Sequence, residues 1–253
     1  FGLRNRMSIL SEAFAHERFY QRIHSTYTFV SEILAYTNSH PKEIIETNKR
    51  AEAETIQAAL SGAGKAKKGV HFKMVPLEKL PNFISYDYLQ KNKADGTKEF
   101  VRTGKISRFD DVTYHARFEP TVESTVPNGY IIPAAFSKLA ENLILHGVKV
   151  DTLTKFQSYK GEIFQIEKFE KAKQSFQGHA MAQAEGKFVG ATRKFKKGDF
   201  LINTAQPLAN LIFYLLEPQS DDGLLTWNFL DEYIEKNKKE NQSVEYPVFK
   251  YIK

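Results

Sequence analysis

The sequence predicts a helical N-terminal segment joined to an α+β domain of mixed strands and two packed helices. Between residues 18 and 38, apolar positions recur every three or four residues, as on one face of a helix. Beyond residue 70, short apolar or alternating runs lie between turn residues, which is typical of strands. Two later apolar segments, residues 134–146 and 207–216, have the length and the boundary residues of helices.

Size and composition exclude several classes of protein. The 253 residues suffice for one large domain or two small ones. Apolar residues make up 42% and charged residues 26%, which excludes a wholly disordered chain or a coiled coil. No run approaches the roughly 18 apolar residues of a membrane span. Cysteine is absent, which excludes disulfides, cysteine-bound zinc and thiol catalysis.

The net charge of +6 is spread along the chain, so it does not indicate a nucleic-acid partner. The chain opens at Phe1 without an initiator methionine or a signal-peptide pattern. We therefore expect an internal start, with further sequence upstream in the complete protein. Any function inferred from the chain is then expected to belong to a longer protein.

The first elements are predicted from local patterns. Residues 7–14 form a short apolar run, which predicts a buried strand that carries Glu12 to its C-terminal edge. An ionisable side chain at such a place is paired, exposed in a cleft or functional, and a structural role is the commoner outcome. Residues 18–38 follow as an amphipathic helix of about six turns.

A second helix and a linker come next. Pro41 is well placed to open the helix at residues 42–60. Residues 61–69 are small and basic, which predicts a flexible linker and a domain boundary. A phosphate loop is the alternative, but the required Gly-x4-Gly-Lys-Ser/Thr spacing is not met. We expect the lysines there (Lys65, Lys67 and Lys68) to lie on a solvated face.

The remaining segments predict strands, turns and two helices. We expect strands at residues 70–75, 83–89, 112–118, 148–153, 163–169 and 200–202. Residues 112–118 alternate with a period of two, as in a half-buried strand. Asp95-Gly96 predicts a hairpin turn, and Gly147 predicts a left-handed cap after the helix at residues 134–146.

Several residue groups have an ordinary structural explanation. His40 and Glu43 have the spacing of a zinc-binding pair, but Pro41 between them favours a helix start in which Glu43 serves the first turn. We expect Asp110-Asp111 and Asp221-Asp222 to be solvated loop acids. The sequence has no Gly-x-Ser-x-Gly nucleophile elbow.

Residues 2–14 read Gly-Leu-Arg-Asn-Arg-Met-Ser-Ile-Leu-Ser-Glu-Ala-Phe and precede a long helix. This stretch resembles zinc carboxypeptidases, most closely bacterial members of the carboxypeptidase A-like metallopeptidase family. Segments between residues 129 and 229 resemble a C-terminal extension of such proteins. The resemblance implies an α/β end-fragment of a metallocarboxypeptidase domain followed by an α+β accessory domain. It implies a terminal strand and helix at 1–40, a helix and linker at 41–69, and the accessory domain at 70–253.

The resemblance also implies a chemistry. Zinc would polarise the scissile carbonyl and lower the pKa of a bound water, and Glu12 would act as general base and then general acid. The family's zinc ligands lie upstream of this glutamate, so they are expected before residue 1, and no metal ligand is assigned in this chain. Arg4 and Arg6 have two roles open to them. They could bind a substrate carboxylate, or pin Glu12 or the domain surface, and the structural role is favoured.

Two hypotheses follow. In the first, the chain is the C-terminal portion of a zinc-dependent carboxypeptidase that acts on peptides, inert alone and completed by an upstream part of the peptidase domain. The resemblance places such a protein in the periplasm or outside the cell. In the second, the chain is a non-catalytic binding or assembly module: residues 70–253 dock a partner or glycan and residues 1–60 form a helical brace.

Overall fold

The chain forms two compact units in this computed structural model, which describes residues 2–15, 17–240 and 242–253. The first unit contains residues 1–70 and 123–253, and the second contains residues 71–122. Phe1, where the chain opens, lies outside the described residues. These units are defined by their internal contacts alone. The predicted division into a peptidase end-fragment, a linker and an accessory domain, with boundaries at residues 40 and 69, therefore stays a prediction.

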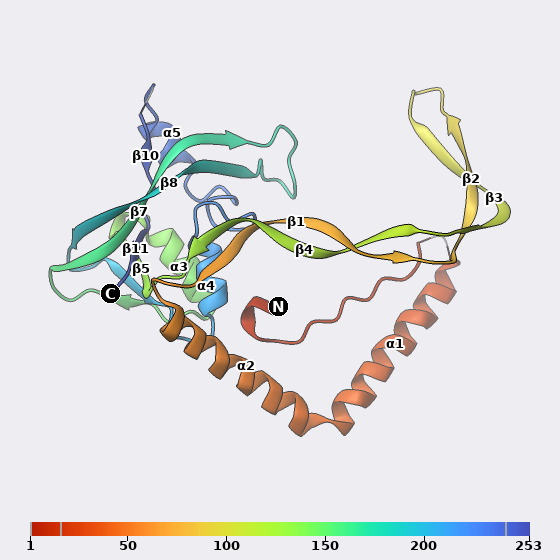
Figure 1. The fold of residues 1–253 in the computed structure, drawn as a ribbon, viewed down its shortest axis with the longest axis horizontal. Coiled ribbons are helices and arrows are strands. Elements are labelled where there is room, and N and C mark those ends of the chain that lie inside the picture. Colours follow the sequence, from red (N-terminus) through yellow and green to blue (C-terminus); the bar gives the residue numbers. More distant parts are fainter. Residues whose placement is uncertain (1, 16, 241) are drawn as a thin grey trace. The chain divides into compact units, whose positions relative to one another are not determined.

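The first unit begins with helices. A short 3-10 helix η1 (Gly2–Arg4) precedes α1 (Phe19–Ser39) and α2 (Pro41–Gly62). Figure 1 shows α1 and α2 as two rods joined end to end, and His40 is the residue between them. Both long helices agree with the sequence prediction to within two residues, and Pro41 opens α2 as expected. None of the residues of α1, all of them described, is buried.

The predicted strand at residues 7–14 is wrong. These residues have no regular secondary structure, and Met7, Ile9, Leu10 and Phe14 are exposed. A strand needs a neighbour that satisfies its backbone hydrogen bonds, and the described residues provide none for this segment. An apolar run is therefore not sufficient to form a strand here.

An antiparallel sheet, with strands of different lengths, forms the centre of the first unit (Figure 1). Its described strands are β5 (Gly129–Ile132), β6 (Asp151–Thr152), β7 (Gln157–Lys171), β8 (Ala182–Phe195), β9 (Phe200–Asn203), β10 (Val244–Glu245) and β11 (Phe249–Tyr251). The strand order is β10-β7-β11-β5-β9-β6, and β8 also pairs with β7. The predicted strands at residues 163–169 and 200–202 lie within β7 and β9.

The predicted strand at residues 148–153 shortens to β6, because the helix before it uses the first of these residues. Gly147 has φ +86°, as the left-handed cap requires. The amide of Val148 donates to Leu143 O at 3.0 Å and closes the cap. Val148 is thereby committed to the helix end rather than to the sheet.

The other helices of the first unit are short: η2 (Ala134–Phe136), α3 (Ser137–Leu145), α4 (Ala209–Leu216) and α5 (Asp231–Asn237). Leu139 and Leu143 of α3 are buried, whereas Phe136 is only partly buried. One core cluster of the sheet contains Ile131, Leu153, Ile163, Phe195, Phe249 and Tyr251.

The segment at residues 61–69 is not the flexible linker that the sequence predicts. α2 continues to Gly62, β1 (Lys67–Leu80) begins at Lys67, and Gly64 N donates to Val126 O at 2.8 Å. Lys68 is half-buried and donates to Asn210 Oδ1 at 2.5 Å, and burial lowers the pKa of its ammonium. This lysine is therefore not on a solvated face.

The second unit consists of strands. β1 pairs with β4 (Val112–Thr125), and β2 (Phe83–Asn92) pairs with β3 (Lys98–Phe109) as an antiparallel hairpin. The hairpin turns at Asp95-Gly96 as predicted. The predicted half-buried face of residues 112–118 is wrong, because Tyr114 and Phe118 are 45% and 61% exposed. A two-stranded ribbon has no second layer to cover one of its faces.

Candidate functional site

Glu12, the predicted general base, lies in the irregular segment between η1 and α1. It is exposed, and its carboxylate has no hydrogen-bond or ion-pair partner among the described residues. It is thus not delivered to the edge of a sheet, because the strand predicted to carry it does not form. The catalytic role implied by the resemblance stays a prediction.

Arg4 ends η1 and binds the C-terminal end of α3. Its guanidinium donates to His146 O at 2.8 Å and also to Nδ1 of the same histidine. Burial and the charge of Arg4 lower the pKa of His146, so this imidazole is held neutral near pH 7. Arg4 therefore joins η1 to α3.

Arg6 binds α2 instead. Its guanidinium lies 2.6 Å from the Glu52 carboxylate. The neighbouring Asn5 donates to Pro207 O at 2.7 Å and accepts from Thr55 Oγ1 at 3.0 Å. The structure thus brings Arg4 and Arg6 against other parts of the first unit, and it places neither of them in contact with Glu12. Their substrate-binding role stays a prediction.

The described residues contain no group of three or more histidine, aspartate or glutamate side chains that could hold a metal ion. The pair His40 and Glu43 is a helix start, as expected. His40 precedes Pro41, its ring stacks on Tyr36 with centroids 4.1 Å apart, and Glu43 lies in the first turn of α2.

A cavity of about 430 Å³ lies in the first unit next to the single tryptophan of the sequence, Trp227. η1, α3, α4, the loop before β8 and the loop at residues 222–229 all contribute to its walls. We name this space the Trp227 cavity. Its lining residues include Asn142, His146, His179, Tyr214, Asp222, Trp227 and Phe229.

Asp222 lines this cavity and is exposed, as predicted for a solvated loop acid, whereas its neighbour Asp221 is only partly exposed. Trp227 Nε1 donates to Asp222 Oδ1 at 2.5 Å, and the Tyr214 hydroxyl donates to Asp221 Oδ1. Burial, followed by this hydrogen bond and the two carboxylate charges, raises the pKa of Tyr214. Asp110 and Asp111 are likewise exposed acids, in the turn before β4, as predicted.

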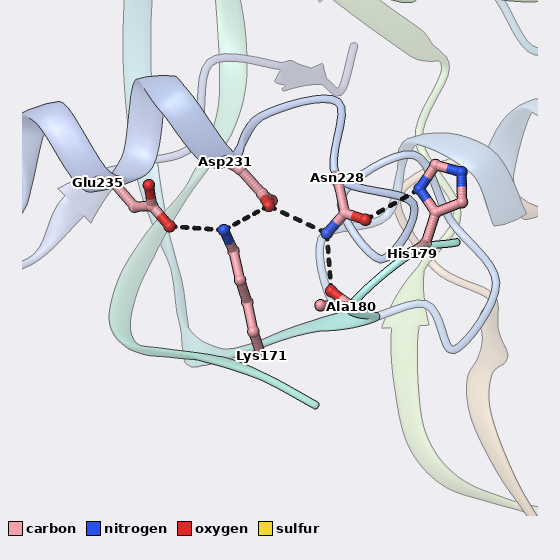
Figure 2. A network of polar contacts seen from close by, with 6 residues as sticks. All are labelled: Lys171, His179, Ala180, Asn228, Asp231 and Glu235. Carbon is pink, nitrogen blue, oxygen red and sulfur yellow. Dashed lines mark hydrogen bonds and ion pairs between the residues drawn. The ribbon is translucent and has the colours of Figure 1, made fainter. Parts of the chain in front are cut away.

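A polar network holds one wall of the cavity in place (Figure 2). Lys171 Nζ lies 2.7 Å from Asp231 and 2.6 Å from Glu235, and the hydrogen bonds to these two carboxylates raise the pKa of the ammonium. Asn228 donates to Asp231 Oδ2 at 3.0 Å and to Ala180 O at 2.9 Å. The network fixes the loop of Trp227 against the end of β7.

Asn228 also decides the tautomer of His179, as the network in Figure 2 shows. Its amide nitrogen faces two oxygen acceptors, so its Oδ1 faces His179 Nδ1 at 3.0 Å. That ring nitrogen therefore carries a hydrogen, and a neutral His179 presents Nε2 as an acceptor. The ring packs edge-on against Trp227, with centroids 5.1 Å apart.

Reasoning from sequence missed the Trp227 cavity because its residues come from segments far apart in the chain. Asn142, His179 and Trp227 belong to three separate elements, and no short motif joins them. One local signal was available. The only tryptophan follows Asp221-Asp222 within six residues, which places an aromatic ring beside two carboxylates.

Comparisons with known proteins give a relationship over part of the chain. The chain is 27% identical over 155 residues to "Carboxypeptidase 2" of Trichophyton rubrum. It is 28% identical over 106 residues to "Carboxypeptidase 2" of Trichophyton tonsurans. These alignments cover 59% and 41% of this chain. The chain spans only 27% and 19% of the length of these relatives. It therefore has a carboxypeptidase-like relationship to two fungal proteins.

No protein-family model matches the chain, and no solved structure matches it. Among the described residues, every helix is too short or too polar to cross a membrane.

Proposed function

We propose that the chain is the C-terminal portion of a zinc-dependent carboxypeptidase that hydrolyses peptide bonds. The observation that carries this proposal is the relationship to proteins named Carboxypeptidase 2. The small share of those relatives that is aligned is consistent with a protein whose other parts supply the zinc ligands. The residues described here do not form a zinc site by themselves.

Exposed apolar side chains of the N-terminal region support a partner that covers α1 and the segment before it. Leu10 is 80% exposed, and Phe19 and Tyr27 of α1 are 74% and 72% exposed. Apolar side chains gathered on one helix face gain free energy when another surface covers them. We assign the covering surface to an upstream part of the peptidase domain.

Glu12 is the proposed proton-transferring residue of that peptidase. Its carboxylate would accept a proton from the attacking water and return it to the leaving amine. An exposed carboxylate between two ordered elements, η1 and α1, is open to such a partner surface. Arg4 and Arg6 would hold η1 on the rest of the chain, since both are engaged there.

The test compares Glu12→Gln with Glu17→Gln in the full-length protein. Glu17 is exposed and close by in the sequence, so its substitution removes the same charge. We expect Glu12→Gln to lower the rate of release of the C-terminal residue from a blocked dipeptide by about 10²–10⁴-fold. We expect Glu17→Gln to leave that rate within about twofold.

Zinc content, measured on the same samples, separates the two parts of the proposal. One zinc per full-length chain in both variants, together with the rate loss, supports it. Hydrolysis that survives Glu12→Gln overturns the role of Glu12. Full-length protein without stoichiometric zinc, or without peptidase activity, overturns the carboxypeptidase itself.

The second candidate function is a binding module, and the Trp227 cavity favours it. A concave space with aromatic walls and a few fixed polar groups is typical of a ligand site. A binding module predicts ligand binding without hydrolysis, which the same two measurements would reveal. The two functions can also coexist in one protein.

A further inference from the structure

The Trp227 cavity carries an inference that does not depend on the carboxypeptidase relationship. Its walls are apolar and aromatic, with contributions from Tyr214, Trp227 and Phe229. Phe229 is 41% exposed and Trp227 is partly exposed, so aromatic surface is open to an incoming group. Aromatic faces attract cations and planar groups.

The polar groups of the cavity include three acceptors. Asp222 contributes a carboxylate, and only its contact with Trp227 Nε1 is present among the described residues. Asn142 Oδ1 is buried and has no hydrogen-bond partner in the described part of the chain. His179 presents Nε2 as a further acceptor when neutral, because Asn228 occupies its Nδ1.

None of the described residues that line the cavity is a lysine or an arginine. His146 lines it too, but its Nδ1 accepts from Arg4 and the imidazole is held neutral, so it contributes one N–H donor and no charge. The carboxylate of Asp221, bound to the Tyr214 hydroxyl, adds a second negative charge beside Asp222. The wall thus offers three acceptors, one of them charged, beside the N–H donors of His146 and of the Asn142 amide, and no positive charge.

We propose that the Trp227 cavity binds the side chain of an arginine residue in a peptide or protein. A guanidinium has donors only, so it satisfies Asn142 Oδ1, Asp222 and His179 Nε2 without leaving an acceptor of its own unpaired. Its plane stacks on an aromatic ring such as Trp227. The aliphatic stem covers the apolar wall, and a cavity of about 430 Å³ accommodates such a residue.

Because Trp227 is the single tryptophan of the sequence, its fluorescence reports on the cavity alone. We would titrate the 253-residue chain with acetyl-arginine N-methylamide and follow the fluorescence of Trp227, with calorimetry as a second measurement. The citrulline counterpart has nearly the same shape without the charge, and the lysine counterpart keeps the charge without the plane. We expect saturable binding of arginine, about tenfold weaker binding of lysine and no binding of citrulline.

Asp222→Asn is the matching variant, because it keeps an oxygen for Trp227 Nε1 and removes the charge. We expect it to weaken arginine binding by about tenfold, whereas Asp151→Asn on β6 changes nothing, since Asp151 is exposed away from the cavity residues. Equal binding of citrulline overturns the charge recognition. Equal binding of lysine overturns the choice of a guanidinium. The absence of a fluorescence change and of heat with arginine overturns the site.

Discussion

Lys250 and Glu217 form an ion pair inside the first unit, with Lys250 Nζ 2.9 Å from Glu217 Oε1 and each side chain only 1% exposed. Tyr130 donates to the same carboxylate oxygen at 2.6 Å. Lys250 donates further to Ser124 Oγ at 2.7 Å, and its ammonium lies 4.2 Å from the ring centroid of Phe188. Such pairing is what allows two charges to be buried together.

We predict that Lys250→Met destabilises the chain by about 3–5 kcal/mol, because it leaves the Glu217 carboxylate buried without its cation. Urea unfolding measures the free energy. Lys187→Met is the control: Lys187 is 69% exposed and its pair with Glu167 lies at the surface, so a change of at most about 1 kcal/mol is expected. The double variant Lys250→Met with Glu217→Gln should recover much of the loss. A loss for Lys250→Met no larger than the control would contradict the account.

The same cluster predicts a pH dependence. Burial, and then the charge of Glu217, raise the pKa of Tyr130 and of Tyr246. The folded chain therefore holds these protons more tightly than the unfolded chain. The stabilisation is complete below the unfolded pKa of about 10 and is lost as the pH rises above it.

We therefore expect the free energy of unfolding to fall between about pH 9 and about pH 11, and to fall less steeply in Tyr246→Phe. Tyr114→Phe is the control, since Tyr114 is largely exposed on β4. Equal slopes for wild type and Tyr246→Phe in urea unfolding at each pH would refute the role of Tyr246.

Two glycines of β8 give a matched pair. A Cβ at Gly186 would lie 2.0 Å from the backbone oxygen of Gln165 on β7, whereas a Cβ at Gly190 has no atom within 4 Å. We expect Gly186→Ala to cost about 1–3 kcal/mol or more, because the backbone of β7 must move. Gly190→Ala should be neutral or slightly stabilising. Thermal unfolding of both variants tests this, and similar melting temperatures would contradict it.

The helices were predictable because their signals are local. The spacing of apolar residues and Pro41 are sufficient to predict α1 and α2, and Gly147 marks the end of α3. The strand predicted at residues 7–14 failed because a strand depends on a neighbour that no local pattern can provide. An apolar segment gains free energy when another surface covers it, but its sequence alone does not identify that surface.

The Trp227 cavity shows the same limit for a site. Its acceptors depend on contacts between distant residues: the tautomer of His179 depends on Asn228, 49 positions away. Burial and then the charge of Arg4, 142 positions away, lower the pKa of His146. The pattern of a single sequence provides no signal for such pairs. The sequence shows the residue types of the cavity, but it does not show that these residues lie together in the fold.

The apolar face of α1 provides the last prediction, because its exposure and its sequence pattern disagree. Ile23 and Leu34 are 54% and 63% exposed, although they lie on the face that the helical spacing marks as apolar. In the 253-residue chain, Ile23→Asn with Leu34→Asn should change the free energy of unfolding by no more than about 0.5–1 kcal/mol, since little packing is lost. The same pair of substitutions should also reduce self-association, measured by analytical ultracentrifugation.

The full-length protein should respond differently if an upstream part of the peptidase domain covers this face. Two large apolar side chains would then be buried, and the same double variant should cost several kcal/mol, because polar groups would replace them in a packed interface. Thr26→Asn with Thr28→Asn is the control on the same helix, where both threonines are exposed. An equally small effect in both lengths of chain would mean that α1 is uncovered in both. The proposed covering of α1 would then be withdrawn, while the test of Glu12 would stand on its own.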